Sequence, residues 1–217
     1  MKQPKVNPTK GFVIVATKRT QFLMGAQNLA ESILDHYEDA RITLFTEQRF
    51  LDDPETQKYL TSYERVLPTP NKTTREKMWG MANSPYDLTF YIDADCEVVS
   101  EDIRGIFKHL EDGKYDMAYV NLTKEGATHF AEWEWGPNIL DDGCDGVPDH
   151  LAHCGGVALY DMRNPLVKEF MLDWYELYLK QRRGEWNPPE FAAIRKGNFR
   201  QWDQLTLWWL IYHSPKY

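Results

Sequence analysis

Short apolar stretches alternate with amphipathic stretches along most of this sequence, and this alternation constrains its fold more than any other feature. Residues 11–17 form a nearly continuous apolar run, which is typical of a strand buried on both faces. In residues 21–37, apolar side chains that begin with Phe22 recur at spacings of three and four, as on the buried face of a helix.

The same alternation continues through the rest of the chain. Further strands are expected at residues 41–46, 63–67, 87–93, 115–120 and 156–160. Further helices are expected at residues 54–60, 73–83, 101–110, 165–180 and 198–212. Thr73 and Glu76 have the spacing of a capping box, which marks the start of the second of these helices. The pattern predicts an α/β fold with a mostly parallel, doubly wound sheet and right-handed crossovers.

Acidic groups are concentrated in the middle of the chain. Residues 81–163 carry 17 acidic and 5 basic side chains, and the whole chain has a net charge of −8 at pH 7. An acidic chain is a poor general binder of nucleic acids and of anionic membranes. No apolar run approaches the length of a membrane span. We therefore expect neither a nucleic-acid partner nor a membrane span.

The N-terminal residues and the cysteine content indicate the cellular compartment. Residues 1–5 lack the apolar core of a secretory signal. The chain has 3 cysteines, an odd number that argues against a disulfide framework and for a reducing compartment. We expect a cytoplasmic protein.

The tripeptide Asp93-Ala94-Asp95 directly follows a predicted buried strand. In an extended chain, residues two apart share a face, so Asp93 and Asp95 can present their carboxylates to one cation. Hard ions such as Mg²⁺ and Mn²⁺ prefer oxygen ligands and often bind one or two carboxylates together with substrate phosphates. The spacing alone is weakly specific. The alternative is that one aspartate caps the next turn while the other is solvated.

The segments Glu76-Lys77-Met78-Trp79 and Phe90-Tyr91-Ile92-Asp93-Ala94-Asp95-Cys96-Glu97-Val98-Val99 resemble the metal-binding region of GT-A-fold glycosyltransferases. They are most similar to the group that contains glycogenin and the bacterial lipopolysaccharide glucosyl- and galactosyltransferases. In that group, a lysine on the preceding helix contacts the donor, and Lys77 precedes Asp93 by the matching interval. The resemblance implies one GT-A-type, Rossmann-like domain over residues 1–217. Residues 11–120 would form its nucleotide- and metal-binding half, and residues 121–217 its sugar and acceptor half.

The resemblance also implies contacts at the nucleotide. Thr17 would line the uridine pocket, Phe22 would lie near the base, and Ala94 would contact the nucleotide-sugar together with its two acidic neighbours. Arg75 and Lys77 are two residues apart, so they do not share a face of one helix. One of them can point to a diphosphate while the other is solvated.

Later segments supply candidates for the sugar side. Residues 153–160 resemble the family strand that lies beside the donor sugar, which implies contacts from Gly155 and Gly156. Trp202-Asp203-Gln204-Leu205 resembles the start of a family helix whose acid sits near the sugar, which makes Asp203 the catalytic candidate. The family usually has a late histidine as third metal ligand, and His213 is the candidate. Trp133 lies in an aperiodic stretch and can face a sugar or pack in the core.

The resemblance implies a glycosyltransferase that depends on Mn²⁺ or Mg²⁺. It would transfer a hexose from a UDP-sugar, with UDP-glucose or UDP-galactose favoured, to a sugar, protein or lipid-linked acceptor, and it would hydrolyse the donor slowly. Two alternatives stay open: a sugar-1-phosphate nucleotidyltransferase and a non-catalytic module that binds carbohydrate or nucleotide. The sequence contains no Gly-x-Gly-x-x-Gly and no Walker-type loop, so dinucleotide and P-loop functions lose their main support.

Overall fold

The computed structural model describes residues 8–73, 75–121, 153–189 and 203–217 of the chain. Trp133 lies outside these residues. The chain divides into two compact units, the first formed by Met1–Ala118 and Gly156–Leu172 and the second by Tyr119–Gly155 and Asp173–Tyr217. None of the described helices combines the length and the apolar character that crossing a membrane requires.

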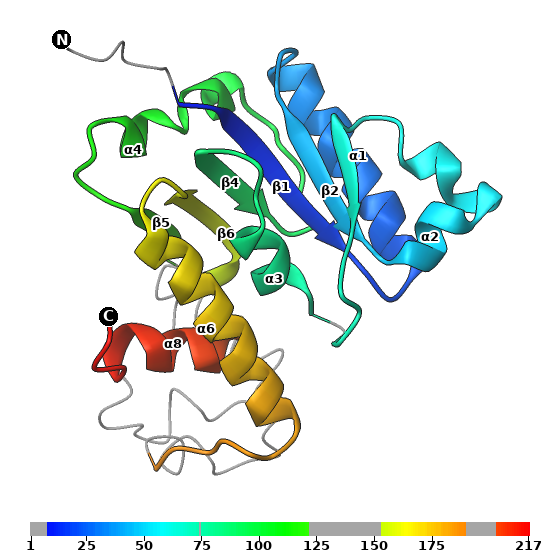
Figure 1. Cartoon of the computed structure of the whole chain (residues 1–217). Helices are drawn as coiled ribbons and strands as arrows, with labels where there is room; N and C mark the ends of the chain where they lie inside the picture. The colour runs from blue at the N-terminus through cyan, green and yellow to red at the C-terminus, as the bar shows by residue number, and fades with distance from the viewer. Residues whose placement is uncertain (1–7, 74, 122–152, 190–202) are drawn as a thin grey trace, which may run out of the picture. The chain divides into compact units, whose positions relative to one another are not determined.

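A six-stranded sheet is the centre of the fold (Figure 1). Its strands are β1 (Lys10–Ala16), β2 (Ile42–Thr46), β3 (Arg65–Pro68), β4 (Leu88–Ile92), β5 (Met117–Asn121) and β6 (His153–Asp161). Their order in the sheet is β3-β2-β1-β4-β6-β5. The pairs β1–β2, β1–β4 and β2–β3 are parallel, and β4–β6 is antiparallel. The predicted α/β class with a mostly parallel sheet is therefore confirmed.

In the described parts of the chain, helices lie between and after these strands. The α-helices are α1 (Thr20–His36), α2 (Gln48–Asp52), α3 (Lys77–Ala82), α4 (Lys108–Glu111), α6 (Pro165–Arg182) and α8 (Asp203–Tyr212). Two short 3-10 helices are η1 (Pro54–Tyr59) and η2 (Glu101–Gly105). The helix expected at residues 101–110 is thus divided between η2 and α4.

The predicted start of α3 at Thr73 is wrong. The buried Glu76 carboxylate does accept the main-chain N–H of Thr73, at 2.6 Å, which is one half of the predicted capping box. This contact closes a turn ahead of the helix, and α3 begins only at Lys77. The displacement places Lys77 at the first helical position.

Both faces of the sheet are covered in the first unit. One face of β1, formed by Phe12, Ile14 and Ala16, packs in a single core with α1. The opposite face packs against α3, where Trp79 meets Phe45 edge to face at 5.6 Å between ring centroids. Alternating side chains of a strand point to opposite faces, so α1 and α3 lie on opposite sides of the sheet (Figure 1).

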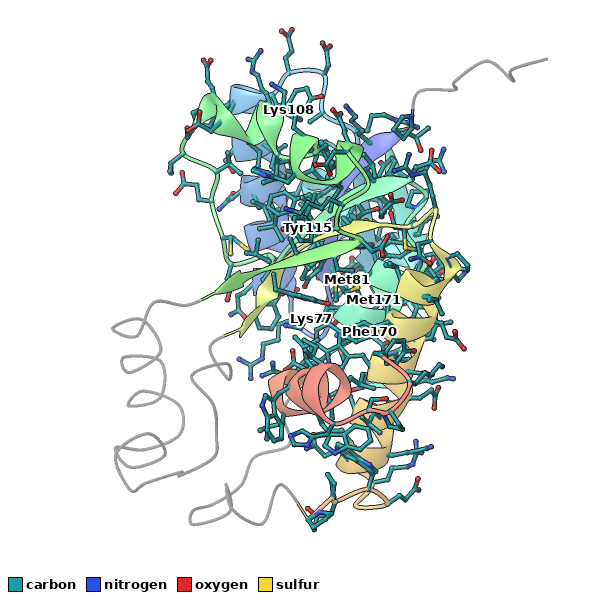
Figure 2. The ribbon with its side chains drawn as sticks, turned by 90° about the vertical axis from the view of Figure 1, so that its left-hand side faces the viewer. Lys77, Met81, Lys108, Tyr115, Phe170 and Met171 are labelled. Atoms are coloured by element: carbon teal, nitrogen blue, oxygen red, sulfur yellow. The ribbon has the colours of Figure 1, made fainter. Side chains whose placement is uncertain are left out.

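Glycine brings α3 close to the sheet. A Cβ atom on Gly80 would lie 2.5 Å from Val15 Cγ2 and 3.3 Å from the Phe45 ring. Figure 2 labels Lys77 and Met81 on this short helix. The close approach keeps the N-terminus of α3 near the strands that the site uses.

In the second unit, α8 packs on the C-terminal half of α6. The buried Trp174 donates its indole N–H to the main-chain oxygen of Asp203 at 2.7 Å. The Thr206 hydroxyl donates to the same oxygen at 2.7 Å. The first turn of α8 is therefore held by hydrogen bonds within the unit.

Candidate functional site

The order of the strands places a switch point at β1 and β4. From β1 the chain moves outward through β2 and β3, and it then returns to form β4 on the other side of β1. Ligands of open α/β sheets bind beyond the carboxyl ends of the strands at such a point. Because β1 and β4 are parallel, Thr17 and Asp93, which follow them, lie at the same edge of the sheet.

Asp93 is held by side chains from two elements. Its Oδ1 atom accepts a hydrogen bond from the buried Tyr91 hydroxyl, and its Oδ2 atom lies 3.6 Å from Lys77 Nζ. The Lys77 side chain is only 11% exposed, so this ion pair is poorly screened by solvent. The prediction that Lys77 and Asp93 share a site is consistent with this contact.

Tyr91 is a member of the site that the sequence reasoning missed. Its position two residues before Asp93 is a usable signal, because alternate residues of a strand share a face. The main chain of Asp93 is also fixed, since its N–H donates to Gly156 O at 2.7 Å. The structure therefore brings Gly156 next to Asp93, and it places Gly155 in the buried part of β6.

Asp95 differs from Asp93 in its surroundings. Its side chain is exposed, whereas Ala94 between the two aspartates is buried. Within the described parts of the chain, no three His, Cys, Asp or Glu side chains come together as a metal-binding group. The two aspartates lie in a turn after β4, where the Cys96 N–H donates to the Asp93 main-chain oxygen at 3.1 Å, and not in the extended chain from which their shared face was predicted. Two carboxylates in one turn fit a hard divalent ion whose remaining ligands are phosphate oxygens and water. The residues present therefore fit Mn²⁺ or Mg²⁺ as a partner of a bound diphosphate.

The loop that follows β1 is anchored by charged side chains. Thr17 is buried, and Lys18 has a left-handed backbone with φ 77°. The Lys18 N–H donates to the carboxylate of Glu47, which is 6% exposed. Arg49 donates to the same carboxylate and, at 2.6 Å, to the main-chain oxygen of Lys18. Glu47 and Arg49 were not predicted, although a buried acid directly after a strand is a signal for such a role.

Two other predicted contacts face solvent. Phe22 is 43% exposed, whereas Leu23 is fully buried. The prediction that Phe22 belongs to the buried face of its helix is therefore wrong: Ala26, Leu29 and Ile33 of that face are buried as expected, but Leu23, not Phe22, continues it to the first turn. Arg75 is exposed just before α3. The roles of Phe22 at the base and of Arg75 at a diphosphate stay predictions.

Asp203 and His213 belong to the second unit. Asp203 is 0% exposed and is the first residue of α8, where a carboxylate is stabilised by the helix N-terminus. His213 is exposed, and its ring lies 4.5 Å from the Trp208 ring. The catalytic role of Asp203 and the ligand role of His213 stay predictions.

Solved structures similar to this chain identify its fold. The glycosyltransferase GlyE of Streptococcus pneumoniae TIGR4, in its apo form, is 16% identical, with a TM-score of 0.56 over 94% of this chain and 43% of GlyE. A second GlyE structure is 14% identical, with a TM-score of 0.55 over 95% of this chain and 44% of GlyE. A CMP:2-keto-3-deoxy-manno-octonic acid synthetase in complex with CTP is 12% identical, with a TM-score of 0.52 over 92% of this chain and 85% of the synthetase.

These likenesses show that the chain has a GT-A-type glycosyltransferase fold, as predicted. The chain spans less than half of the length of GlyE. No protein-family model matches the sequence. A search of curated proteins also finds no match.

Proposed function

We propose that this protein is a metal-dependent glycosyltransferase that transfers a hexose from UDP-glucose or UDP-galactose to a sugar, protein or lipid-linked acceptor. The observation that carries the proposal is the contact of Lys77 with Asp93 at the switch point of the sheet. In this contact the ammonium group of Lys77 lies 3.6 Å from the carboxylate that follows β4, which supports a role in binding a charged ligand. The residues of this arrangement belong to a fold that glycosyltransferases share.

Each predicted nucleotide- or metal-binding residue of the first unit has a role in this proposal. Asp93 and Asp95 would hold Mn²⁺ or Mg²⁺, which when bound supplies positive charge that stabilises a diphosphate leaving group. Lys77 donates to the diphosphate and stabilises the negative charge that develops as UDP departs. Thr17 and Phe22 bind the uridine, and Arg75 is a second donor for the phosphates.

The sugar side of the proposal rests on fewer contacts. Gly155, Gly156 and Trp133 would contact the donor sugar, and His213 would complete the metal ligands. Asp203 would stabilise the reacting sugar carbon or act as a base. If it does, Asp203→Asn lowers UDP release by about 10²-fold and leaves UDP affinity unchanged. Circular dichroism must show parental melting, because Asp203 also stabilises the start of α8.

Calorimetry with UDP tests the proposal directly. We expect UDP to bind with Mn²⁺ present and not in excess chelator, because Asp93 and Asp95 need a cation between them and the phosphates. A UDP-release assay with UDP-glucose and UDP-galactose should then show slow hydrolysis without an acceptor. Equal UDP affinity with and without chelator would contradict the metal-dependent site. Binding without turnover across varied acceptors would favour a non-catalytic module.

A second candidate is a sugar-1-phosphate nucleotidyltransferase. It is favoured by the likeness to the synthetase that was solved with CTP, because this chain spans 85% of that protein. A sugar-1-phosphate nucleotidyltransferase transfers the nucleoside monophosphate group of a nucleoside triphosphate to the sugar phosphate, which forms a nucleotide-sugar and releases pyrophosphate. Pyrophosphate release without UDP release from UDP-sugars would therefore replace the first proposal by the second.

A further inference from the structure

Helix α1 contacts the segment 93–98, which we call the acidic loop, at two points. At the first, a Cβ atom on Gly25 would lie 2.5 Å from the main-chain oxygen of Ala94. At the second, the Val98 N–H donates to the Ser32 hydroxyl at 3.0 Å. That hydroxyl in turn donates to Leu29 O at 2.8 Å.

The glycine has a packing reason for its place in α1. Glycine inside a helix is less favourable than alanine, because it loses more conformational freedom on folding. Gly25 lies within the first half of α1 and does not have a positive φ angle, so the backbone conformation does not require glycine at this position. What it allows is the approach of Ala94, a buried residue, to the helix backbone.

Ser32 is a neutral and buried anchor. It lies seven residues, or about two helical turns, after Gly25, so both residues are on one face of α1. The acidic loop therefore runs along α1 from Ala94 to Val98, with Asp95 between the two contacts. Cys96 and Val98 also pack against the core that α1 shares with the sheet. The loop is thus fixed at its main chain and on its inner side.

Asp95 depends on these main-chain contacts more than Asp93 does. Asp93 is held by Tyr91, Lys77 and the Gly156 carbonyl. The Asp95 side chain is exposed, so its position follows from where the loop backbone lies. Displacing the backbone at Ala94 would change the distance between the two carboxylates.

We propose that α1 sets the position of the acidic loop, with Gly25 and Ser32 as positioning residues for the ion and the diphosphate. The part of this inference that names these ligands rests on the proposed function. An alanine at Gly25 puts a methyl group against a main-chain oxygen, which cannot rotate away as a side chain can. The loop must shift, and the pair of carboxylates shifts with it.

Gly25→Ala tests the inference, and Gly105→Ala is its matched control. A Cβ atom on Gly105 meets nothing within 4 Å, so this variant makes the same chemical change without a clash. In Gly25→Ala, we expect the Mn²⁺ concentration for half-maximal UDP binding to rise by about 10- to 100-fold, the range for residues that orient metal ligands. Excess Mn²⁺ should restore UDP binding. A general loss of stability would raise this concentration only by the reciprocal of the folded fraction, which circular dichroism measures independently.

Hydrogen exchange of the acidic loop is a second readout that needs no ligand. We expect faster exchange of the Val98 amide in Gly25→Ala and in Ser32→Ala, and parental exchange in Gly105→Ala. If Gly25→Ala does not fold, Ser32→Ala decides, because it removes the acceptor of the Val98 N–H. Parental exchange and parental Mn²⁺ dependence in the folded variants would overturn the inference. A parent protein that binds no UDP with Mn²⁺ would overturn the proposed function, and exchange alone would then decide whether α1 positions the loop.

Discussion

Two loops meet at the switch point of the sheet, and they are anchored in opposite ways. The loop after β1 is fixed by charged groups, since Glu47 accepts from Lys18 N–H and from Arg49. The acidic loop after β4 is fixed to α1 by neutral groups, namely the backbone at Gly25 and the Ser32 hydroxyl. The loop expected to bind an uncharged base is held by charged side chains, whereas the loop that carries the two carboxylates is joined to α1 by close packing and a neutral hydrogen bond.

This difference has an electrostatic advantage. Charged anchors on α1, in addition to Lys77 on α3, would compete with a ligand for Asp93 and Asp95. Neutral anchors fix the backbone without neutralising the two carboxylates, whose charge is then balanced by Lys77 and by bound ligands. We therefore expect variants of the acidic loop to change the Mn²⁺ dependence of UDP binding. Variants of the loop after β1 should change the affinity for UDP alone.

The largest effect is expected for Asp95→Asn. The change keeps the shape of the side chain and removes the charge that favours a cation, so UDP affinity and turnover should fall together by about 10²-fold. Calorimetry with UDP and Mn²⁺ and a UDP-release assay measure the two quantities. Glu101→Gln, which removes one exposed charge from η2, is the control for net charge. Parental UDP affinity in Asp95→Asn would leave Asp95 a solvated surface residue.

A loss of at most comparable size is expected for Lys77→Ala. The variant removes a buried cation 3.6 Å from Asp93, and UDP binding should weaken by about 1.5–3 kcal/mol, the range for a hydrogen bond to a charged group. UDP calorimetry at saturating Mn²⁺ measures this change, with the exposed Lys72→Ala as control. If the two variants bind UDP equally well, Lys77 serves the fold and not the ligand.

The smallest effect is expected for Glu47→Gln. The amide keeps one oxygen as acceptor for the Lys18 N–H, but an NH₂ group takes the place of the oxygen that accepts from Arg49, so the contact with Arg49 is lost. UDP affinity should fall by about 1 kcal/mol, with no change in the Mn²⁺ concentration for half-maximal binding. The exposed Glu55→Gln is the matched control. A shift in the Mn²⁺ dependence would remove the distinction between the two loops.

The sheet could be predicted from sequence because its central strands are buried on both faces. The apolar runs before Thr17 and Asp93 are short, nearly continuous and bounded by polar residues, and both became strands. The start of α3 could not be predicted, because the Thr73 and Glu76 pattern is the same whether the carboxylate closes a turn or caps a helix. That choice depends on the burial of Glu76, which a local pattern does not contain.

Only a part of the candidate site was predictable from the sequence. Asp93 and Lys77 stand out by charge at a strand end and at a helix start, and the structure brings them together. Gly25 and Ser32 act through segments more than sixty residues away in the sequence, and a glycine or a serine in a helix has no pattern that points to such a partner. Contacts of this kind depend on the packed fold.

The reversed direction of β6 has a consequence for how such a domain can change over time. The residues that follow the parallel strands β1 and β4 lie at the candidate site. Strand β6 runs antiparallel to β4, so residues near its start, among them Gly156, lie there instead. The segment that enters β6 can therefore gain or lose residues while the pairing from Val157 to Asp161 keeps its register. Selection can therefore vary the length of that entry without rebuilding β1 or β4, whose ends carry Thr17 and Asp93.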